Sequence, residues 1–223
     1  MPKLHHFTLD PFSRRIRLAL AEKGEGVDLI DEKPWAPSER LIDANPSGLT
    51  PVYAEQSGAS ICGVEALSEF LEERPNSKKL LPAKLYDRAE ARRLVAWFDV
   101  KFYAEVTEPL LTEKVVKRFS KVAAPPDMAR VRMALQRLRP HLDYLAWLAE
   151  ERAWLAGPEL SLADLAAAAH LSVVDYLGDV NWDEQPVARA WYQRIKSRPS
   201  FRTLLADALP AMPASAHYAD LDF

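Results

Sequence analysis

The turn Asp10-Pro11-Phe12-Ser13 is the first place along the chain where side chains could do chemistry. It separates a strand-like segment from a helical one, a position from which a Cys or Ser can be presented to a thiol substrate. A carboxylate with a pKa of about 3.9 is ionised at pH 7, so Asp10 would have no proton to donate. Its charge would also raise the pKa of a nearby thiol, whose reactive form is the thiolate. Ser13 is the weak substitute, because we expect it to point inward as the helix cap.

A second candidate lies in Asn45-Pro46-Ser47-Gly48-Leu49-Thr50-Pro51-Val52. Pro51 cannot donate to a sheet ladder, so it belongs at the start or the edge of a strand. A cis Thr50–Pro51 bond would turn the backbone of Thr50 outward, leaving an N–H and a C=O to pair with a peptide-like ligand. An ordinary trans turn proline is the alternative.

Cys62 is the single cysteine of the 223 residues, which excludes an internal disulfide, a CxxC motif and a cysteine-rich metal site. It precedes a predicted helix, where a thiol pKa can fall, but its apolar, strand-like setting favours a buried, unreactive thiol. A lone cysteine fits a reducing compartment. The sequence has no apolar run of about 20 residues and no apolar signal core, so we expect a soluble cytoplasmic protein and not an integral membrane protein. A net charge of −3 gives no general attraction to nucleic acid.

The elements that must position these residues form two groups. Residues 1–75 alternate between strand and helix patterns and predict a small α/β domain. Strands are expected at 4–8, 27–32, 51–55 and 60–62, and helices from after the Pro11 turn to Gly24, at 38–45 and at 64–73. Residues 76–83 are predicted to be a linker, because the stretch from Pro75 to Pro82 holds Asn, Ser, two Lys and two Pro.

Residues 84–209 predict an all-helical domain, and residues 210–223 a C-terminal tail. A long amphipathic segment covers 85–120, where Pro109 should kink it, and further helices are expected at 127–152, 162–177, 186–196 and from about 200. Ser161 and Asp164 fit a capping box, so Asp164 is interpreted as structural.

Four motifs in order resemble the cytosolic glutathione S-transferase superfamily over nearly the whole chain. They are the turn and helix at 11–18, the segment Asn45 to Val52, the Ser161-x-x-Asp164 box, and Trp191 through Arg198-Pro199-Ser200-Phe201. The resemblance implies a thioredoxin-like N-terminal domain, an all-helical C-terminal domain and a homodimer. It also implies that glutathione would pair its cysteinyl backbone with Thr50, before a cis Pro51.

The chain departs from the family at two places. Related classes have Ser or Cys where Asp10 stands, and an acidic residue followed by Ser, which holds the γ-glutamyl end of glutathione, where Gly63-Val64 stand. Val64 has no hydroxyl, Gly63 cannot pair with an ammonium group, and Glu65 lies on a neighbouring helical position. We therefore interpret Thr50, Pro51, Gly63, Val64 and Glu65 as remnants of a glutathione site and predict no catalytic residue.

Three segments are candidate partner-binding surfaces. Trp35 lies between prolines in a loop, as an interface anchor or folded back on its own domain. Residues 113–139 hold eight Lys or Arg against two acids, either a solvated face or an attraction for an acidic partner; the candidates are Lys114, Lys117, Arg118 and Lys121. The tail alternates acids with apolar groups, so Asp220, Asp222 and Phe223 either dock a partner or pack back on the helical domain.

The altered turn, Gly63-Val64 and the tail resemble the branch of the family that binds the division filament protein FtsZ. This implies a non-catalytic, homodimeric adaptor that regulates cell division and constriction, with FtsZ and other division proteins as partners and with no cofactor, metal or nucleic acid. A glutathione-dependent transferase or peroxidase is one alternative, and glutathione would be its only cofactor. A small-molecule carrier using a groove near Trp97, Phe98 and Tyr103 is the other, although these aromatic residues also suit a helix-bundle core.

Overall fold

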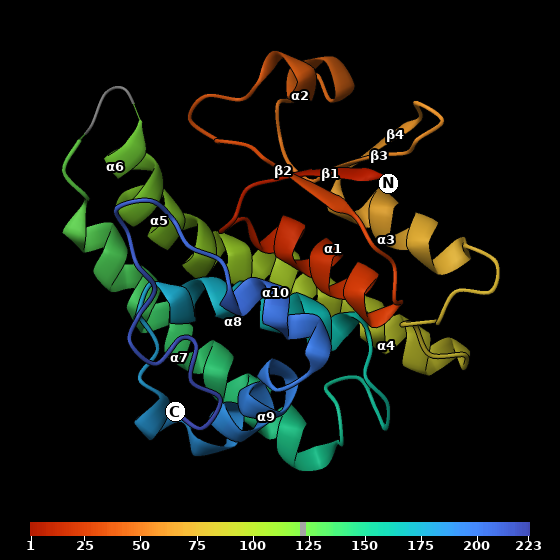
Figure 1. Ribbon diagram of the computed structural model, residues 1–223. Coiled ribbons are helices and arrows are strands. Elements are labelled where there is room, and N and C mark those ends of the chain that lie inside the picture. The colour runs from red at the N-terminus through yellow and green to blue at the C-terminus, as the bar shows by residue number, and fades with distance from the viewer. Residues whose placement is uncertain (121–123) are drawn as a thin grey trace.

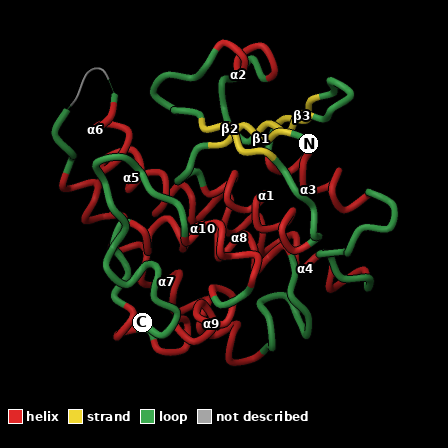
Figure 2. The backbone as a smooth tube through the Cα atoms, viewed as in Figure 1, coloured by secondary structure: helices red, strands yellow, loops and turns green. Residues whose placement is uncertain are grey.

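A four-stranded sheet occupies one end of the molecule, and helices make up the rest (Figure 1; Figure 2). The computed structural model describes residues 1–120 and 124–223. The strands are β1 (Lys3–His6), β2 (Asp28–Asp31), β3 (Val52–Ala54) and β4 (Ser60–Cys62), in the order β2-β1-β3-β4. β1 runs parallel to β2 and antiparallel to β3, and β3 runs antiparallel to β4. All four strands occur where the sequence predicted them: β4 has the predicted bounds, β2 and β3 are shorter at both ends, and β1 begins at Lys3 and ends at His6.

Three helices accompany the sheet: α1 (Pro11–Glu22), α2 (Glu39–Ala44) and α3 (Val64–Glu73). α1 and α3 lie between the sheet and the helical part of the chain, whereas α2 lies on the other side of the sheet (Figure 1). Leu4 of β1 and Ile16 of α1 belong to the same buried core as Leu67 of α3. Ser38 caps α2 through a hydrogen bond from the Leu41 N–H at 3.1 Å. The βαβαββα order predicted from the sequence is therefore confirmed.

The remaining elements that the structure describes are helical. They are α4 (Leu85–Ala96), η1 (Trp97–Thr107), α5 (Glu108–Leu111), η2 (Thr112–Val116), α6 (Lys117–Phe119), α7 (Met128–Glu151), α8 (Leu162–Tyr176), η3 (Trp182–Glu184), α9 (Pro186–Lys196), η4 (Pro199–Phe201) and α10 (Arg202–Leu205). The backbone stays helical through Pro109, where the sequence predicted a kink, and wide π turns form η1 and η2 on either side of α5. Of the helices described, none is long and apolar enough to cross a membrane.

Helix α8 is the central element of the helical part, because every one of its residues is buried. Its run Ala166–Ala169 has small side chains, which allow α1, α4 and η1 to pack closely around it. The predicted capping box starts the helix: Asp164 Oδ2 accepts the Ser161 N–H at 3.0 Å, while Oδ1 accepts the Leu155 N–H at 2.9 Å. Trp191 Nε1 also donates to Asp164, at 3.3 Å. Asp164 is thus structural, as predicted.

Buried charges attach α1 to the helical part. Arg17 donates from Nη1 and Nη2 to the two carboxylate oxygens of Asp207, each at 2.9 Å, and Arg14 donates to Asp207 Oδ2 at 3.1 Å. Arg14 also donates to Ser172 Oγ in α8 at 2.7 Å and to Tyr218 Oη at 3.0 Å. One helix of the sheet region is therefore held at once by α8, by the segment after α10 and by the tail.

Replacing Asp207 should destabilise the fold strongly. Because Asp207→Ala leaves two buried guanidinium groups without their carboxylate, we expect the free energy of unfolding to fall by about 3–5 kcal/mol. The matched control is Asp183→Ala, which removes an Asp whose side chain is 91% exposed and which pairs with Arg189 at 3.2 Å. A surface pair of this kind contributes at most about 1 kcal/mol. Denaturant titration measures both values, and equal losses would contradict the role given to Asp207.

Candidate functional site

Asp10 is the N-cap of α1. Its Oδ1 accepts the Phe12 N–H at 3.2 Å, and its Oδ2 accepts the Ser13 N–H at 3.0 Å and the Ser13 hydroxyl at 2.5 Å. The prediction that Ser13 is the cap is wrong, because the helix begins at Pro11 and Ser13 already lies inside its first turn. Ser13 does point inward, as expected, and its side chain is fully buried.

The loop before β3 reaches the same carboxylate. The Thr50–Pro51 bond is cis, as the sequence suggested, and the Thr50 hydroxyl donates to Asp10 Oδ2 at 2.8 Å. Within the described residues, no hydrogen bond to the N–H or C=O of Thr50 is found. The peptide-pairing edge expected beside Pro51 is therefore present, while the carboxylate next to it is already saturated with donors.

Two groups at this site have shifted pKa values. Burial raises the pKa of Asp10, and the hydrogen bonds from Ser13 and Thr50 oppose that shift. Burial, together with the nearby carboxylates of Asp10 and Glu108, raises the pKa of Tyr103 to about 12. With this pKa the Tyr103 hydroxyl is neutral at pH 7 and can donate a hydrogen bond. The Tyr103 ring lies 4.8 Å from that of Phe12, on the helical side of the site.

A cavity of about 170 Å³ lies between the turn at Asp10, the loop at Thr50 and the helical run around Tyr103. Small-molecule sites usually occupy about 300–1,000 Å³, so this cavity is small for a drug-sized ligand. Of the three aromatic residues expected at a carrier groove, only Tyr103 lines it. Phe98 is buried in the core, and Trp97 packs on Tyr144 at 4.6 Å. The helix-core interpretation therefore holds for Phe98, and the groove near Trp97 and Phe98 is not this cavity.

The predicted γ-glutamyl remnants lie at the start of α3. Gly63 has a φ of +84°, a conformation that favours glycine, and it donates its N–H to the Pro51 carbonyl at 3.1 Å. Val64 opens the helix, and Glu65 is exposed beside it. Cys62 is half-buried, and its Sγ donates to the Ala44 carbonyl at 3.2 Å. The side chains of Gly63 and Val64 thus supply no polar group to this end of the site.

Arg15 is a polar group at this end that the sequence analysis missed. Its fully buried guanidinium donates to Ser68 Oγ at 3.0 Å and to the Val64 carbonyl at 3.2 Å, and it forms an ion pair with Asp99 of η1. The signal in the sequence is the alternation of arginines with apolar residues in α1, which places cations on a helix face that must be buried. Among the described residues there is no group of three His, Cys, Asp or Glu side chains that could share a metal ion.

Two of the three predicted surfaces meet. Trp35 is half-buried, with its ring edge-on to Phe7 at 5.6 Å and stacked on Phe119 at 5.4 Å and 19°. The guanidinium of Arg118 lies 5.8 Å from the Phe119 ring and donates to the Ala211 carbonyl at 2.8 Å. Trp35 therefore joins the basic segment in one surface, which we name the Trp35 patch: Trp35, Arg118 and Phe119.

The other predicted cations of this segment carry less free charge than the sequence suggested. Lys117 pairs with Glu113 at 2.5 Å, and Lys114 pairs with Asp179. Glu113 also pairs with Arg130 at 3.0 Å. Lys121 lies outside the residues that the structure describes.

The C-terminal tail packs back on the helical domain, which is one of the two arrangements expected from the sequence. The Phe223 ring lies 5.4 Å from that of Trp182, and the Lys196 ammonium lies 3.9 Å from the Phe223 ring centre. Gln193 donates to the Phe223 carbonyl oxygen at 2.9 Å. Asp220 and Asp222 remain exposed. The structure does not bring these tail residues together with the Trp35 patch.

We predict that titration calorimetry with glutathione gives no binding heat for the natural chain, because Asp10 repels a thiolate and Val64 offers no hydroxyl. The double variant Asp10→Ser, Val64→Ser restores a hydroxyl at both places and should bind measurably. Ser is as good an N-cap as Asp, so α1 is expected to stay intact. Binding by the natural chain that is as tight as that of the double variant would contradict this interpretation of the site.

Comparisons with known proteins agree with this fold. The Glutathione S-transferase, N-terminal domain family matches residues 11–74, and the Glutathione S-transferase, C-terminal domain family matches residues 116–199. FtsZ-localized protein A of Caulobacter vibrioides is 48% identical, over 99% of this chain and 97% of that protein.

Solved structures that cover the whole of this chain include the following two. FzlA from C. crescentus superposes with a TM-score of 0.95 at 47% identity, over 99% of its own length. A glutathione S-transferase from Rhodospirillum rubrum superposes with a TM-score of 0.95 at 45% identity, over 100% of its length. With its thioredoxin-like sheet domain, its helical domain and its cis Pro51, the chain belongs to the glutathione S-transferase family.

Proposed function

We propose that this protein is a non-catalytic adaptor of the cytoplasm that binds FtsZ and regulates cell division and constriction. The observation that carries the proposal is Asp10, whose Oδ2 accepts three hydrogen bonds, from the Ser13 N–H, the Ser13 hydroxyl and the Thr50 hydroxyl. Held in this way as an acceptor, Asp10 itself offers neither a nucleophile nor the hydroxyl that would stabilise a thiolate. The 48% identity to FtsZ-localized protein A supports FtsZ as the partner.

The Trp35 patch is the surface that we assign to the partner. A Trp ring fixed between Phe7 and Phe119 is already ordered before binding, so little conformational entropy is lost when a partner covers it. Trp and Arg are also the residues most often found as binding hot spots. Lys114 and Lys117 are paired with acids, and this leaves Arg118, 5.8 Å from the Phe119 ring, as the cation of the Trp35 patch. The exposed acids Asp220 and Asp222 of the tail form a separate candidate contact.

Co-sedimentation with assembled FtsZ tests both the partner and the surface. We expect the natural chain to pellet with the filaments, less so at high salt because Arg118 contributes through its charge. Trp35→Ala and Arg118→Glu should each weaken binding by about tenfold or more. The matched control, Arg202→Glu, changes an exposed arginine of α10 and should bind normally.

Two outcomes of that experiment separate the parts of the proposal. If the natural chain does not pellet at any salt concentration, the adaptor function is wrong. If it pellets and both patch variants pellet equally well, FtsZ binding stands and the assignment of the Trp35 patch is wrong.

We also infer a homodimer, from an apolar face of α4, η1 and α7. Tyr86, Val100 and Trp147 are 86%, 67% and 52% exposed on these elements. The rings of Trp97, Tyr144 and Trp147 follow one another across the same helices, at 4.6 and 6.0 Å. Soluble monomers rarely leave large contiguous apolar areas in water, so a second copy is the natural cover for this face.

Sedimentation velocity measures the dimer directly. We expect the natural chain to sediment as a dimer and Val100→Glu to sediment as a monomer, because the new carboxylate would be buried unpaired in the interface. Ile42→Glu is the matched control, since Ile42 is an exposed apolar residue of α2, on the far side of the sheet. A monomeric natural chain, or a dimer unaffected by Val100→Glu, would count against this interface.

A glutathione-dependent activity is the second candidate function. The cis Thr50–Pro51 edge and the neutral Tyr103 hydroxyl favour it, because a peptide-like ligand could pair with the first and a thiol could receive a hydrogen bond from the second. The calorimetric titration of the natural chain with glutathione discriminates this candidate from the adaptor.

A further inference from the structure

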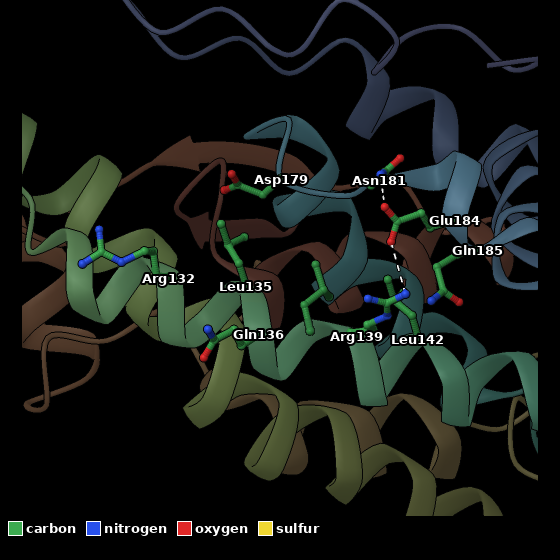
Figure 3. A pocket seen from close by; sticks show the side chains of 10 residues that line it. Arg132, Leu135, Gln136, Arg139, Leu142, Asp179, Asn181, Glu184 and Gln185 are labelled. Carbon is green, nitrogen blue, oxygen red and sulfur yellow. Dashed lines mark hydrogen bonds and ion pairs between the residues drawn. The ribbon is translucent and has the colours of Figure 1, made fainter.

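A groove with no role in the proposed function lies between α7 and the connection from α8 to α9 (Figure 3). Its volume is about 520 Å³, within the range of about 300–1,000 Å³ that small-molecule sites occupy. Leu135, Leu138 and Leu142 of α7 give it an apolar side, and Asp179 stands on the opposite side. The groove shares no lining residue with the cavity at Asp10.

Asp179 is the unusual group in this groove. Its side chain is only 9% exposed, and Lys114 donates to its Oδ1. Within the described residues, Oδ2 has no hydrogen-bond partner although it is buried. Burial raises the pKa of Asp179, and the ion pair with Lys114 opposes that shift. A buried acceptor without a donor is costly, so a ligand that donates to Oδ2 would be favoured.

The two ends of the groove differ in their remaining charge. At one end, Arg139 pairs with Glu184 at 3.5 Å, and Glu184 accepts a hydrogen bond from Asn181 at 2.8 Å, as the dashed lines of Figure 3 mark. At the other end, Arg132 is exposed, and no ion pair of it is found in the described part of the chain. Arg132 lies on the same side of α7 as Leu135 and Asp179 (Figure 3). This end therefore offers an anion acceptor and a guanidinium across an apolar surface.

We propose that the groove binds a small zwitterion of the α-amino-acid or short-peptide class. Its ammonium group donates to Asp179 Oδ2, its carboxylate pairs with Arg132, and its apolar side chain lies on Leu135 and Leu138. A purely anionic ligand would leave Asp179 unsatisfied and would be repelled by it, and a purely cationic ligand would meet Arg132. The Asp179 carboxylate and the Arg132 guanidinium together therefore select a molecule that carries one positive and one negative charge.

Calorimetry and saturation-transfer NMR with the full chain test this proposal. The probes are L-leucine, whose two charges are adjacent, and the dipeptide Leu-Leu, whose charges are further apart. We expect saturable binding of at least one of these two probes. The probe that binds shows how far apart the ammonium and the carboxylate of the ligand must be. The comparison compounds 4-methylpentanoate, which lacks the ammonium group, and isopentylamine, which lacks the carboxylate, should bind about tenfold or more weakly.

Variants locate the binding in the groove. Arg132→Gln and Asp179→Asn should each weaken binding of the better probe by about tenfold or more. Asp179→Asn also changes the contact with Lys114, so Arg132→Gln, at an exposed position, is the variant that leaves the fold undisturbed. The matched control is Arg137→Gln, an exposed arginine of α7 that lines a different cavity. If neither probe binds up to its solubility limit, or if binding is equal in all three variants, the proposal is overturned.

Discussion

The contact between Asp207 and two arginines of α1 is the constraint on which the arrangement of the two halves depends. Burying three charges is costly unless their geometry is good and their remaining donors are satisfied. Arg17 meets both oxygens of Asp207, while Arg14 shares one of them and also binds Ser172 of α8. The N-terminus of α1 is thereby fixed relative to the helical domain. The position of Asp10 opposite Tyr103 follows from that docking.

Under the proposed adaptor function the family's fold persists without its chemistry, and this docking shows how that is possible. A catalytic site keeps polar groups free for its substrate, whereas here the groups of the turn satisfy one another. Asp10 takes up the Ser13 hydroxyl and the Thr50 hydroxyl, and it caps α1 at the same time. The turn is therefore stable without a ligand. The side chains of Asp10, Ser13 and Thr50 are therefore committed to one another and are not free to act on a substrate.

Local sequence signals predict most of the helices and strands. The features that they do not predict depend on pairs of residues far apart in the chain. α3 and α9 begin and end where their caps, prolines and apolar spacing predicted. The cap of α1 is Asp10 and not the predicted Ser13, because Pro11 takes the first helical position that proline favours. No local pattern could have paired Arg17 with Asp207, since 190 residues separate them. A charged residue on a helix also resembles a surface residue until its partner is known.

The basic segment shows why counted charge is a poor guide to a binding surface. Its eight cations face two acids within the segment, but Asp179 and Glu108 from outside it also form pairs with Lys114 and Arg130. The Glu113–Lys117 pair could have been foreseen from its i, i+4 spacing, whereas the Lys114–Asp179 pair depends on how α8 ends. Arg137 is exposed and has no ion pair among the described residues either. In the two proposed sites the remaining cations are Arg118, next to the Phe119 ring, and Arg132, which lines the same groove as Asp179. These two cations lie in different surroundings, one aromatic and one acidic, so each selects a different class of ligand.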